Sequence, residues 1–236
     1  MAYAITIVGG CGHVGLPLGI ALANAGADVT LYDTNPRGVA EVAAGKMPFL
    51  EWGADAELAS ALDAGRLRAT TDPQSMSSAE VVVVTIGTPV DEFMDPKVRS
   101  FDRAIRGLRP HVRDGQLLVL RSTVSPGMTD RLVKWLAAEG LKVDVAFCPE
   151  RIAQAFALKE LHELPQIVSG SSPAALKRAK DLFRLLTPDT VELPPLEAEL
   201  AKLFANNSSS WDFAIPPDSA VYIPLSIKFP DRKSVV

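Results

Sequence analysis

The stretch AITIVGGCGHVG at residues 4–15 passes from a short apolar run straight into closely spaced glycines, and a helix-like segment follows. This order is typical of a strand, a tight turn and a helix N-terminus. In the spacing GxGxxG, the first glycine allows a sharp turn, the second leaves room for a pyrophosphate, and the third lets the helix pack closely on the strand. These glycines are Gly10, Gly12 and Gly15. The turn therefore predicts a dinucleotide site, in which the backbone N–H groups of His13 and Val14 and the positive end of the helix dipole face the anion.

A carboxylate after the second apolar run supports this prediction and selects the cofactor. The run at 28–32 ends at Asp33, about 20 residues beyond the glycines, where an acid that binds the adenosine ribose is expected. Such a carboxylate accepts hydrogen bonds from ribose hydroxyls and repels a 2′-phosphate, so NAD is favoured over NADP. Arg37 lies nearby on what we interpret as a loop, where a lone arginine is usually solvated. The alternative, a glycine-rich turn that binds nothing, leaves the position of Asp33 unexplained.

The composition limits the classes of partner. The 236 residues are 47% hydrophobic, enough for a sizeable core, and the net charge of −4 gives no electrostatic reason to expect nucleic acid or an anionic membrane as a partner. Cys11 and Cys148 form neither a disulfide framework nor a metal-ligand cluster, so we expect no metal and a cytoplasmic location. The apolar run at 81–86 is far too short to cross a bilayer, and we expect neither export nor membrane insertion.

Short apolar runs alternate with amphipathic stretches along most of the chain. This pattern predicts an α/β, Rossmann-like, doubly wound parallel sheet with helices on both faces. Strands are expected at 4–8, 28–32, 67–69, 81–86, 116–120, 143–147 and 166–168. Helices are expected at 14–25, 54–64, 101–108, 129–139, 173–186 and 196–206.

The end of the chain follows a different pattern. Residues 208–236 contain a run of serines and scattered prolines, with neither helical nor clean strand periodicity. We expect an irregular tail here, because the prolines stop the preceding helix. We also expect this tail to be non-native, since the residues DRKSVV at 231–236 can be encoded by a widely used short-read sequencing adapter followed by a stop codon.

Polar side chains follow several later strands, at the edge where open α/β sheets place their ligands. Thr88 precedes a proline and suits a phosphate or ribose contact, although such a threonine is also a common turn residue. Thr123 follows a buried-looking strand and points to the same crevice, or serves as a turn hydroxyl. Glu150 directly follows Pro149, and this rigid turn suits a general base or water-orienting group. Its alternative is a surface ion pair with Arg151.

Lys202 and Asn206 stand four residues apart on the last predicted helix and therefore share a face. An ammonium and an amide side by side can stabilise the alkoxide that forms when a substrate hydroxyl loses its proton and delivers hydride. The alternative is a solvated helix face.

Together these segments resemble the UDP-glucose/GDP-mannose dehydrogenase family of nucleotide-sugar dehydrogenases. The resemblance runs from about Ile5 to Asn206, and the order and spacing of its segments are far more specific than any one of them. The segments are VGLP at 14–17, the loop at 45–51, AGRLRATTDP at 64–73, IGTP at 86–89, RSTVSPG at 121–127, CPERIA at 148–153, ELPQIVSG at 163–170 and EAELAKLFANN at 197–207.

The resemblance implies NAD-dependent oxidation of the primary alcohol of a nucleotide sugar, with a UDP-sugar expected, to the uronic acid. It implies that Thr88 lines the cofactor, that Thr123 contacts the cofactor and helps to position the catalytic water, and that Glu150 is the acid/base residue. Lys202 and Asn206 match the active-site lysine and asparagine of the family.

The resemblance also has gaps. The family's second hydride transfer starts from a thiohemiacetal on a cysteine in a separate C-terminal domain, and neither cysteine of this chain matches it. We therefore expect a truncated chain without the full reaction: an NAD-binding domain at 1–194, the start of an interdomain helix at 195–207, and the tail. The full-length form is expected to be a homodimer. Two further positions depart from the family pattern. The family has an acidic residue, a glycine and a basic residue where this chain has Gln-Ala-Phe at 154–156, and it typically has a threonine where this chain has Met128.

Two other functions stay open. A 3-hydroxyacid dehydrogenase also uses a lysine and an asparagine four apart and needs no cysteine, and a standalone NAD-binding module needs no turnover at all. Reduction of NAD by a hydroxyacid, by a UDP-sugar or by neither distinguishes the three.

Overall fold

The computed structural model describes residues 3–87 and 98–207, and within these ranges the side chains of 98–100, 102 and 205–207 are not described. Thr88 and the predicted tail at 208–236 therefore lie outside the described residues. No helix in the described part of the chain is both long and apolar enough to span a membrane.

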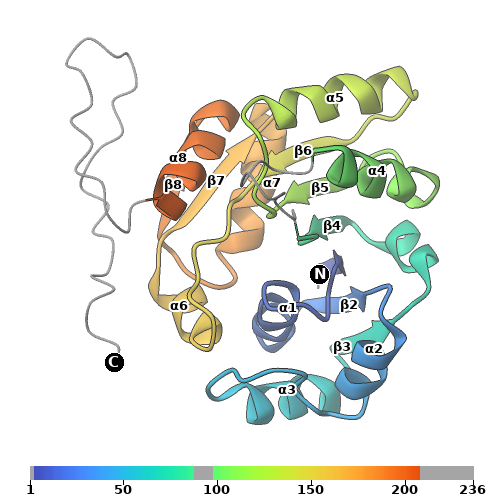
Figure 1. Cartoon of the computed structure of the whole chain (residues 1–236), viewed down its shortest axis with the longest axis vertical. Coiled ribbons are helices and arrows are strands. Elements are labelled where there is room, and N and C mark those ends of the chain that lie inside the picture. Colours follow the sequence, from blue (N-terminus) through green and yellow to red (C-terminus); the bar gives the residue numbers. More distant parts are fainter. Residues whose placement is uncertain (1–2, 88–97, 208–236) are drawn as a thin grey trace.

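The core of the fold is an eight-stranded sheet with the order β3-β2-β1-β4-β5-β6-β7-β8 (Figure 1). The strands are β1 (Ala4–Val8), β2 (Asp28–Tyr32), β3 (Leu67–Thr70), β4 (Val81–Val84), β5 (Leu117–Leu120), β6 (Asp144–Phe147), β7 (Gln166–Gly170) and β8 (Thr190–Glu192). All neighbours from β3 to β6 are parallel, which confirms the predicted doubly wound arrangement.

Strand β7 departs from the predicted parallel order, because it runs antiparallel to β6, with Phe147 opposite Ser169. The chain between these strands stays beyond the carboxyl end of β6 and does not cross the sheet, so β7 starts at that edge and runs back. Strand β8 was not predicted, because it is short and none of its residues is buried.

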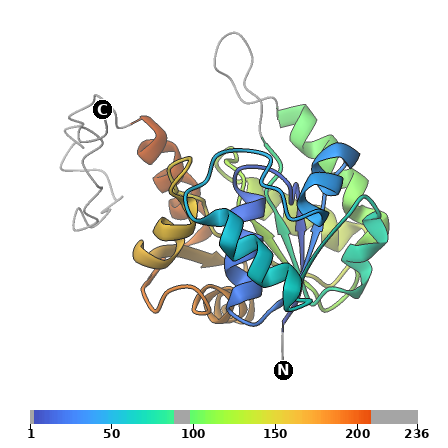
Figure 2. The same ribbon diagram turned by 90° about the horizontal axis from the view of Figure 1, so that it is seen from below.

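Helices cover both faces of the sheet (Figures 1 and 2). They are α1 (Gly15–Asn24), α2 (Pro36–Ala43), α3 (Ala54–Asp63), α4 (Val98–Leu108), α5 (Met128–Ala138), α6 (Ala157–Glu163), α7 (Pro173–Phe183) and α8 (Pro195–Asn207). Two of them, α2 and α6, were missed from the sequence. The signal for α2 was present, because the side chain of Asn35 caps it by accepting hydrogen bonds from the N–H groups of Arg37 and Gly38, and Pro36 follows the cap.

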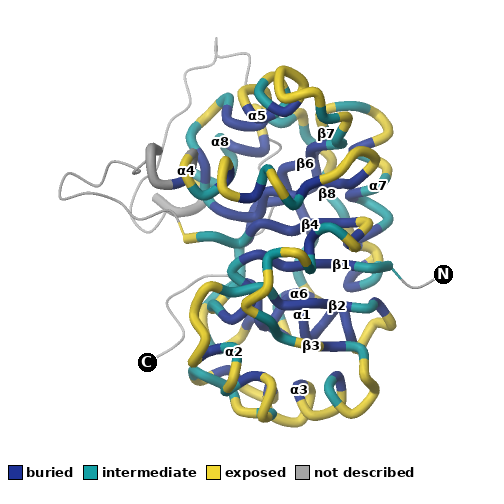
Figure 3. The backbone as a smooth tube through the Cα atoms, turned by 90° about the vertical axis from the view of Figure 1, so that its right-hand side faces the viewer, coloured by how far each residue is buried: buried dark blue, intermediate teal, exposed yellow. Residues whose placement is uncertain are grey.

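Alternation along the central strands divides the buried residues into two layers. Val81 and Val83 of β4 belong to the layer shared with α1, α3 and α7, whereas Val82 and Val84 belong to the layer under α4 and α5. The inner strands, from β2 to β7 in the order of the sheet, are mostly buried, whereas the edge strands β3 and β8 are more exposed, as are the outer helices and the loops (Figure 3). A sheet buried on both faces explains why its strands read as continuous apolar runs.

Candidate functional site

The glycine turn after β1 is shaped by close backbone packing. The positive φ of +79° falls on Gly9, not on Gly10, which we expected to make the sharp turn. Gly10 is required for another reason: a Cβ there would lie 2.7 Å from the Cα of Leu31 on β2. A Cβ on Gly15 would lie 2.4 Å from the carbonyl oxygen of Gly9, so the start of α1 packs directly on the turn, whereas we expected this glycine to let the helix pack on the strand. At Gly12 the nearest atom is 3.3 Å away, which leaves this position the most open of the three.

The same turn offers unpaired hydrogen-bond donors. Helix α1 begins after Val14 without a side-chain cap, and no acidic residue lies in its first turn. Within the described residues, no hydrogen bond engages the backbone N–H groups of His13 and Val14. Free N–H groups at the positive end of a helix, beside an open glycine, fit the diphosphate of a dinucleotide.

Asp33 lies directly beside this turn, at the end of β2. Its Oδ2 accepts a hydrogen bond from the backbone N–H of Cys11 at 3.1 Å, and its Oδ1 accepts one from Asn35 at 3.0 Å. Arg37 is in the first turn of α2 and not on a loop as we expected, and its Nε pairs with Glu41 at 2.9 Å. A carboxylate close to the glycine turn, with the neighbouring arginine already paired, favours an unphosphorylated ribose.

Five of the predicted site residues line one cavity of about 240 Å³ at the carboxyl ends of β1, β4, β5 and β6. They come from the glycine turn, the loop after β5, the turn after β6 and helix α8. They are His13, Val14, Thr123, Glu150 and Lys202. The predicted glycines lie in the adjoining turn and at the start of α1, with Asp33 beside them, and none of these residues lines the cavity. Asn206 lies in α8, but its side chain, like all of Thr88, is outside the described residues.

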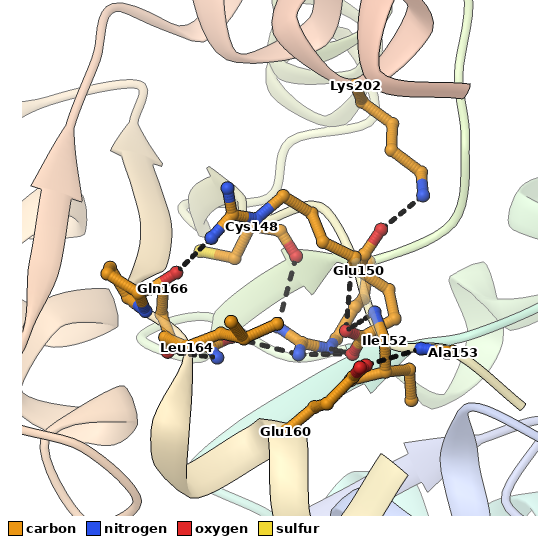
Figure 4. A network of polar contacts seen from close by, with 11 residues as sticks. Cys148, Glu150, Ile152, Ala153, Glu160, Leu164, Gln166 and Lys202 are labelled. Atoms are coloured by element: carbon orange, nitrogen blue, oxygen red, sulfur yellow. Dashed lines mark hydrogen bonds and ion pairs between the residues drawn. The ribbon is translucent and has the colours of Figure 1, made fainter. Parts of the chain in front are cut away.

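The carboxylate of Glu150 is buried and held by an ion pair (Figure 4). Its Oε2 accepts a hydrogen bond from Nε of Arg121 at 2.6 Å. Its Oε1 accepts from the backbone N–H groups of Arg151 and Ile152, at 2.7 and 2.9 Å. The partner is thus Arg121 and not the side chain of Arg151, which we considered as the alternative; that guanidinium donates to the carbonyl of Pro165.

Sequence reasoning missed Arg121, although it lies in the segment RSTVSPG. Its side chain is completely buried, and besides Glu150 it contacts the carbonyl of Cys148 and Oε1 of Gln166. The available signal was its position directly after a fully buried strand, where an arginine must find a partner inside the protein.

Lys202 reaches the cavity from α8. Its Nζ donates a hydrogen bond to the backbone carbonyl oxygen of Glu150 (Figure 4). The ammonium therefore lies at the same turn as the Glu150 carboxylate and faces the cavity that Thr123 also lines. This places a cation, a hydroxyl and a carboxylate around one space.

The thiols of Cys11 and Cys148 are poor nucleophiles. Burial raises the pKa of Cys148 to about 12, and burial together with the negative charge of Asp33 raises the pKa of Cys11 to about 12. At neutral pH both side chains are therefore protonated and weakly reactive.

Comparison with known proteins gives one consistent result. The model of the UDP-glucose/GDP-mannose dehydrogenase family, NAD binding domain, matches residues 3–187. The UDP-N-acetyl-D-mannosamine dehydrogenase of Methanocaldococcus jannaschii is 29% identical over 215 residues, covering 89% of this chain and 49% of that protein. The NDP-N-acetyl-D-galactosaminuronic acid dehydrogenase of Ralstonia nicotianae is 30% identical, covering 86% and 50%. The chain spans about half the length of the curated relatives that it matches.

Solved structures agree with this result. The UDP-D-ManNAc dehydrogenase of Pyrococcus horikoshii superposes with a TM-score of 0.80 at 29% identity, covering 86% of this chain and 49% of that chain. The UDP-glucose dehydrogenase of Pyrobaculum islandicum gives a TM-score of 0.80 at 27% identity, covering 87% and 49%.

Proposed function

The chain belongs to the UDP-glucose/GDP-mannose dehydrogenase family as its NAD-binding domain, and from this we propose that it is the cofactor-binding part of an enzyme that oxidises the primary alcohol of a UDP-sugar to a uronic acid. The observation that carries the proposal is the meeting of Thr123, Glu150 and Lys202 in one cavity beside the glycine turn. The relatives named as UDP-N-acetyl-D-mannosamine dehydrogenases make this sugar nucleotide the first substrate to test.

The domain boundaries are part of the proposal. Residues 1–194 form the NAD-binding domain, and 195–207 begin a helix that leads toward a second domain. The family model of the NAD-binding domain, which ends at residue 187, supports the first boundary.

The cofactor is held at the glycine turn. The N–H groups of His13 and Val14 bind the diphosphate, Gly12 leaves room for it, and Asp33 accepts hydrogen bonds from the adenosine ribose. The resemblance of the segment IGTP at 86–89 assigns a further cofactor contact to Thr88. Bound NAD supplies the hydride acceptor for the oxidation.

The side chains around the cavity prepare the alcohol for oxidation. The ammonium of Lys202 stabilises the alkoxide as the substrate hydroxyl gives its proton to a water molecule in the cavity, which passes it to solvent. Asn206, one helical turn further along α8, adds an amide donor. The hydroxyl of Thr123 orients the water that later attacks the oxidised carbon. Because Arg121 pairs with the carboxylate of Glu150, we assign Glu150 mainly to accepting a hydrogen bond from that water.

This chain alone does not complete the reaction. The second oxidation requires a thiolate that attacks the aldehyde, and burial raises the pKa of both Cys11 and Cys148 to about 12, which disfavours the thiolate at neutral pH. We therefore expect the polypeptide to bind NAD without sustained turnover.

The experiment titrates the purified chain with NAD and then assays NADH formation with UDP-N-acetylmannosamine, UDP-glucose and 3-hydroxybutyrate supplied in turn. The expected result is saturable NAD binding with no steady NADH production from any of them. Steady production from 3-hydroxybutyrate would identify a hydroxyacid dehydrogenase instead, and steady production from a UDP-sugar would contradict the assignment as a partial enzyme.

A further inference from the structure

Glu199 is a buried carboxylate on α8 that the proposed chemistry does not use. It is only 1% exposed, and within the described part of the chain it accepts hydrogen bonds from the start of α5. Its Oε2 accepts a hydrogen bond from the backbone N–H of Gly127 at 2.6 Å. Its Oε1 accepts two from Thr129, one from the backbone N–H at 2.8 Å and one from the hydroxyl at 2.6 Å.

These contacts replace the cap that α5 lacks. Gly127 is the N-cap residue of α5 and has no side chain to accept a hydrogen bond from the first turn. The Glu199 carboxylate, from the distant helix α8, supplies this acceptor. It lies at the N-terminus of α5, where the helix dipole favours a negative charge. A carboxylate removed from water is stable only when its oxygens are satisfied, so the contact fixes how α8 lies on α5.

The two elements joined in this way both carry proposed site residues. Lys202 is three residues beyond Glu199 on α8, and residues three apart on a helix share a face. Gly127 ends the loop 121–127, which begins directly after β5 and carries Thr123. The hydrogen bonds of Glu199 therefore connect the loop that carries Thr123 to the helix that carries Lys202.

We propose that Glu199 is a positioning residue, which holds Lys202 against the carbonyl of Glu150 by docking α8 on the N-terminus of α5. The importance of the Lys202 position for catalysis rests on the proposed function. The placement of Lys202 is a property of the free chain, and it is measured without cofactor or substrate.

The test compares the reactivity of individual lysines. The folded full chain is treated with a small amount of acetic anhydride, and the acetylation of each lysine is quantified by mass spectrometry. The readout is the rate at Lys202 divided by the rate at Lys159, whose side chain is 68% exposed and far from α8 in sequence. In the wild-type protein this ratio is expected to lie well below one, because Lys202 is half-buried and hydrogen-bonded.

The Glu199→Ala variant removes the carboxylate. We expect the ratio to rise roughly tenfold, the population change that corresponds to the loss of one charge-assisted hydrogen bond. Glu199→Gln keeps one acceptor oxygen and the side-chain volume, so we expect a ratio between those of the wild type and the alanine variant. If Glu199→Ala does not fold, the glutamine variant carries the test, and an unchanged ratio in it overturns the proposal.

The matched control is Ser172→Ala. The Ser172 hydroxyl caps α7 by accepting a hydrogen bond from the N–H of Ala175 at 3.0 Å, so the variant loses a comparable cap on a different helix. We expect a lower melting temperature with an unchanged Lys202 ratio. If the ratio rises equally in Ser172→Ala, a general loss of stability exposes Lys202, and the proposal is overturned. An unchanged ratio in folded Glu199→Ala also overturns it.

NAD titration of the same variants separates this inference from the proposed function. Ser172 caps α7, away from the glycine turn and the cavity, so Ser172→Ala is expected to bind NAD as the wild-type protein does. The Glu199 variants are compared by their lysine ratios, because the loop that Glu199 holds carries Thr123. Failure of the wild-type protein to bind NAD refutes the cofactor assignment, whereas the lysine ratios alone decide the role of Glu199.

Discussion

Arg121 and Glu150 form a buried ion pair at the carboxyl ends of β5 and β6, with 2.6 Å between Nε and Oε2. The guanidinium also donates to Gln166 on β7 at 3.0 Å and lies 4.8 Å from the ring centre of Phe183 on α7. One fully buried arginine thus links neighbouring strands of the sheet to the turn that carries both the Glu150 carboxylate and the carbonyl that binds Lys202.

Replacing Arg121 by methionine leaves the buried carboxylate of Glu150 without its cation. We expect the free energy of unfolding to fall by about 3–5 kcal/mol, measured by urea denaturation, because an uncompensated buried charge is strongly destabilising. The double variant Arg121→Met/Glu150→Gln is expected to regain a large part of the loss. A loss below about 1 kcal/mol in Arg121→Met, typical of exposed ion pairs, would show that this pair is not buried in solution.

Alanine substitutions in the glycine turn separate folding from binding. In Gly15→Ala the new Cβ meets the carbonyl of Gly9, and we expect a loss of about 1–3 kcal/mol of stability from overpacking. In Gly12→Ala the new Cβ lies 3.3 Å from the carbonyl oxygen of Gly9, a much milder contact, so the loss of stability is expected to stay below about 1 kcal/mol. Its Cβ projects into the space proposed for the diphosphate, and NAD affinity is expected to fall by about tenfold or more. Urea denaturation and NAD titration of both variants provide the measurement. Normal NAD affinity in stable Gly12→Ala would place the diphosphate elsewhere.

Ala155 is a non-glycine residue in the left-handed region, with φ of +71°. A Cβ in this conformation costs about 1–2 kcal/mol, partly offset by the smaller backbone entropy of alanine in the unfolded chain. We therefore expect Ala155→Gly to raise the free energy of unfolding by about 0.5–1 kcal/mol. Ala153→Gly, in the same loop but without positive φ, is the control and is expected to lower it. Destabilisation of equal size in both variants would show that Ala155 is unstrained.

Glu51 predicts a specific pH dependence. Burial raises its pKa, and hydrogen bonds from the backbone N–H groups of Leu158, Ala157 and Ala155 offset part of the rise. Because the folded pKa exceeds the unfolded value of about 4.3, the stabilising contribution is complete below that pH and is lost as the pH rises through the folded pKa. As the pH falls from 7 toward 4.3, wild-type protein should gain stability relative to Glu51→Gln, measured by urea denaturation of both. A constant difference, or one of opposite sign, would contradict the raised pKa.

The sequence predicted most accurately what depends on local pattern. Strands β1 and β2 were predicted to the residue, because each apolar run is bounded by a turn glycine or by Asp33. Thr123, Glu150 and Lys202 were predicted from strand ends and helix spacing together with the family resemblance, and they share one cavity in the structure.

What the sequence did not reveal depends on distant partners. Arg121 and Glu199 lie in recognised segments, but their roles follow from contacts with Glu150 and with the start of α5, which no local pattern encodes. The reversal of β7 follows from the path taken after β6. The close fit at Gly9, where a Cβ would lie 3.2 Å from Thr85 just beyond β4, likewise depends on a residue distant in the sequence.

The central claim is that the turn after β1 binds the diphosphate of NAD while Asp33 holds the adenosine ribose. Isothermal titration calorimetry of the folded chain with NAD and with NADP, at two temperatures so that a zero enthalpy cannot hide binding, tests it most directly. We predict saturable binding of NAD at one site, binding of NADP that is weaker by about tenfold or more, and a loss of this preference in Asp33→Asn. Absence of saturable heat with NAD at both temperatures, from protein shown to be folded, would contradict the account.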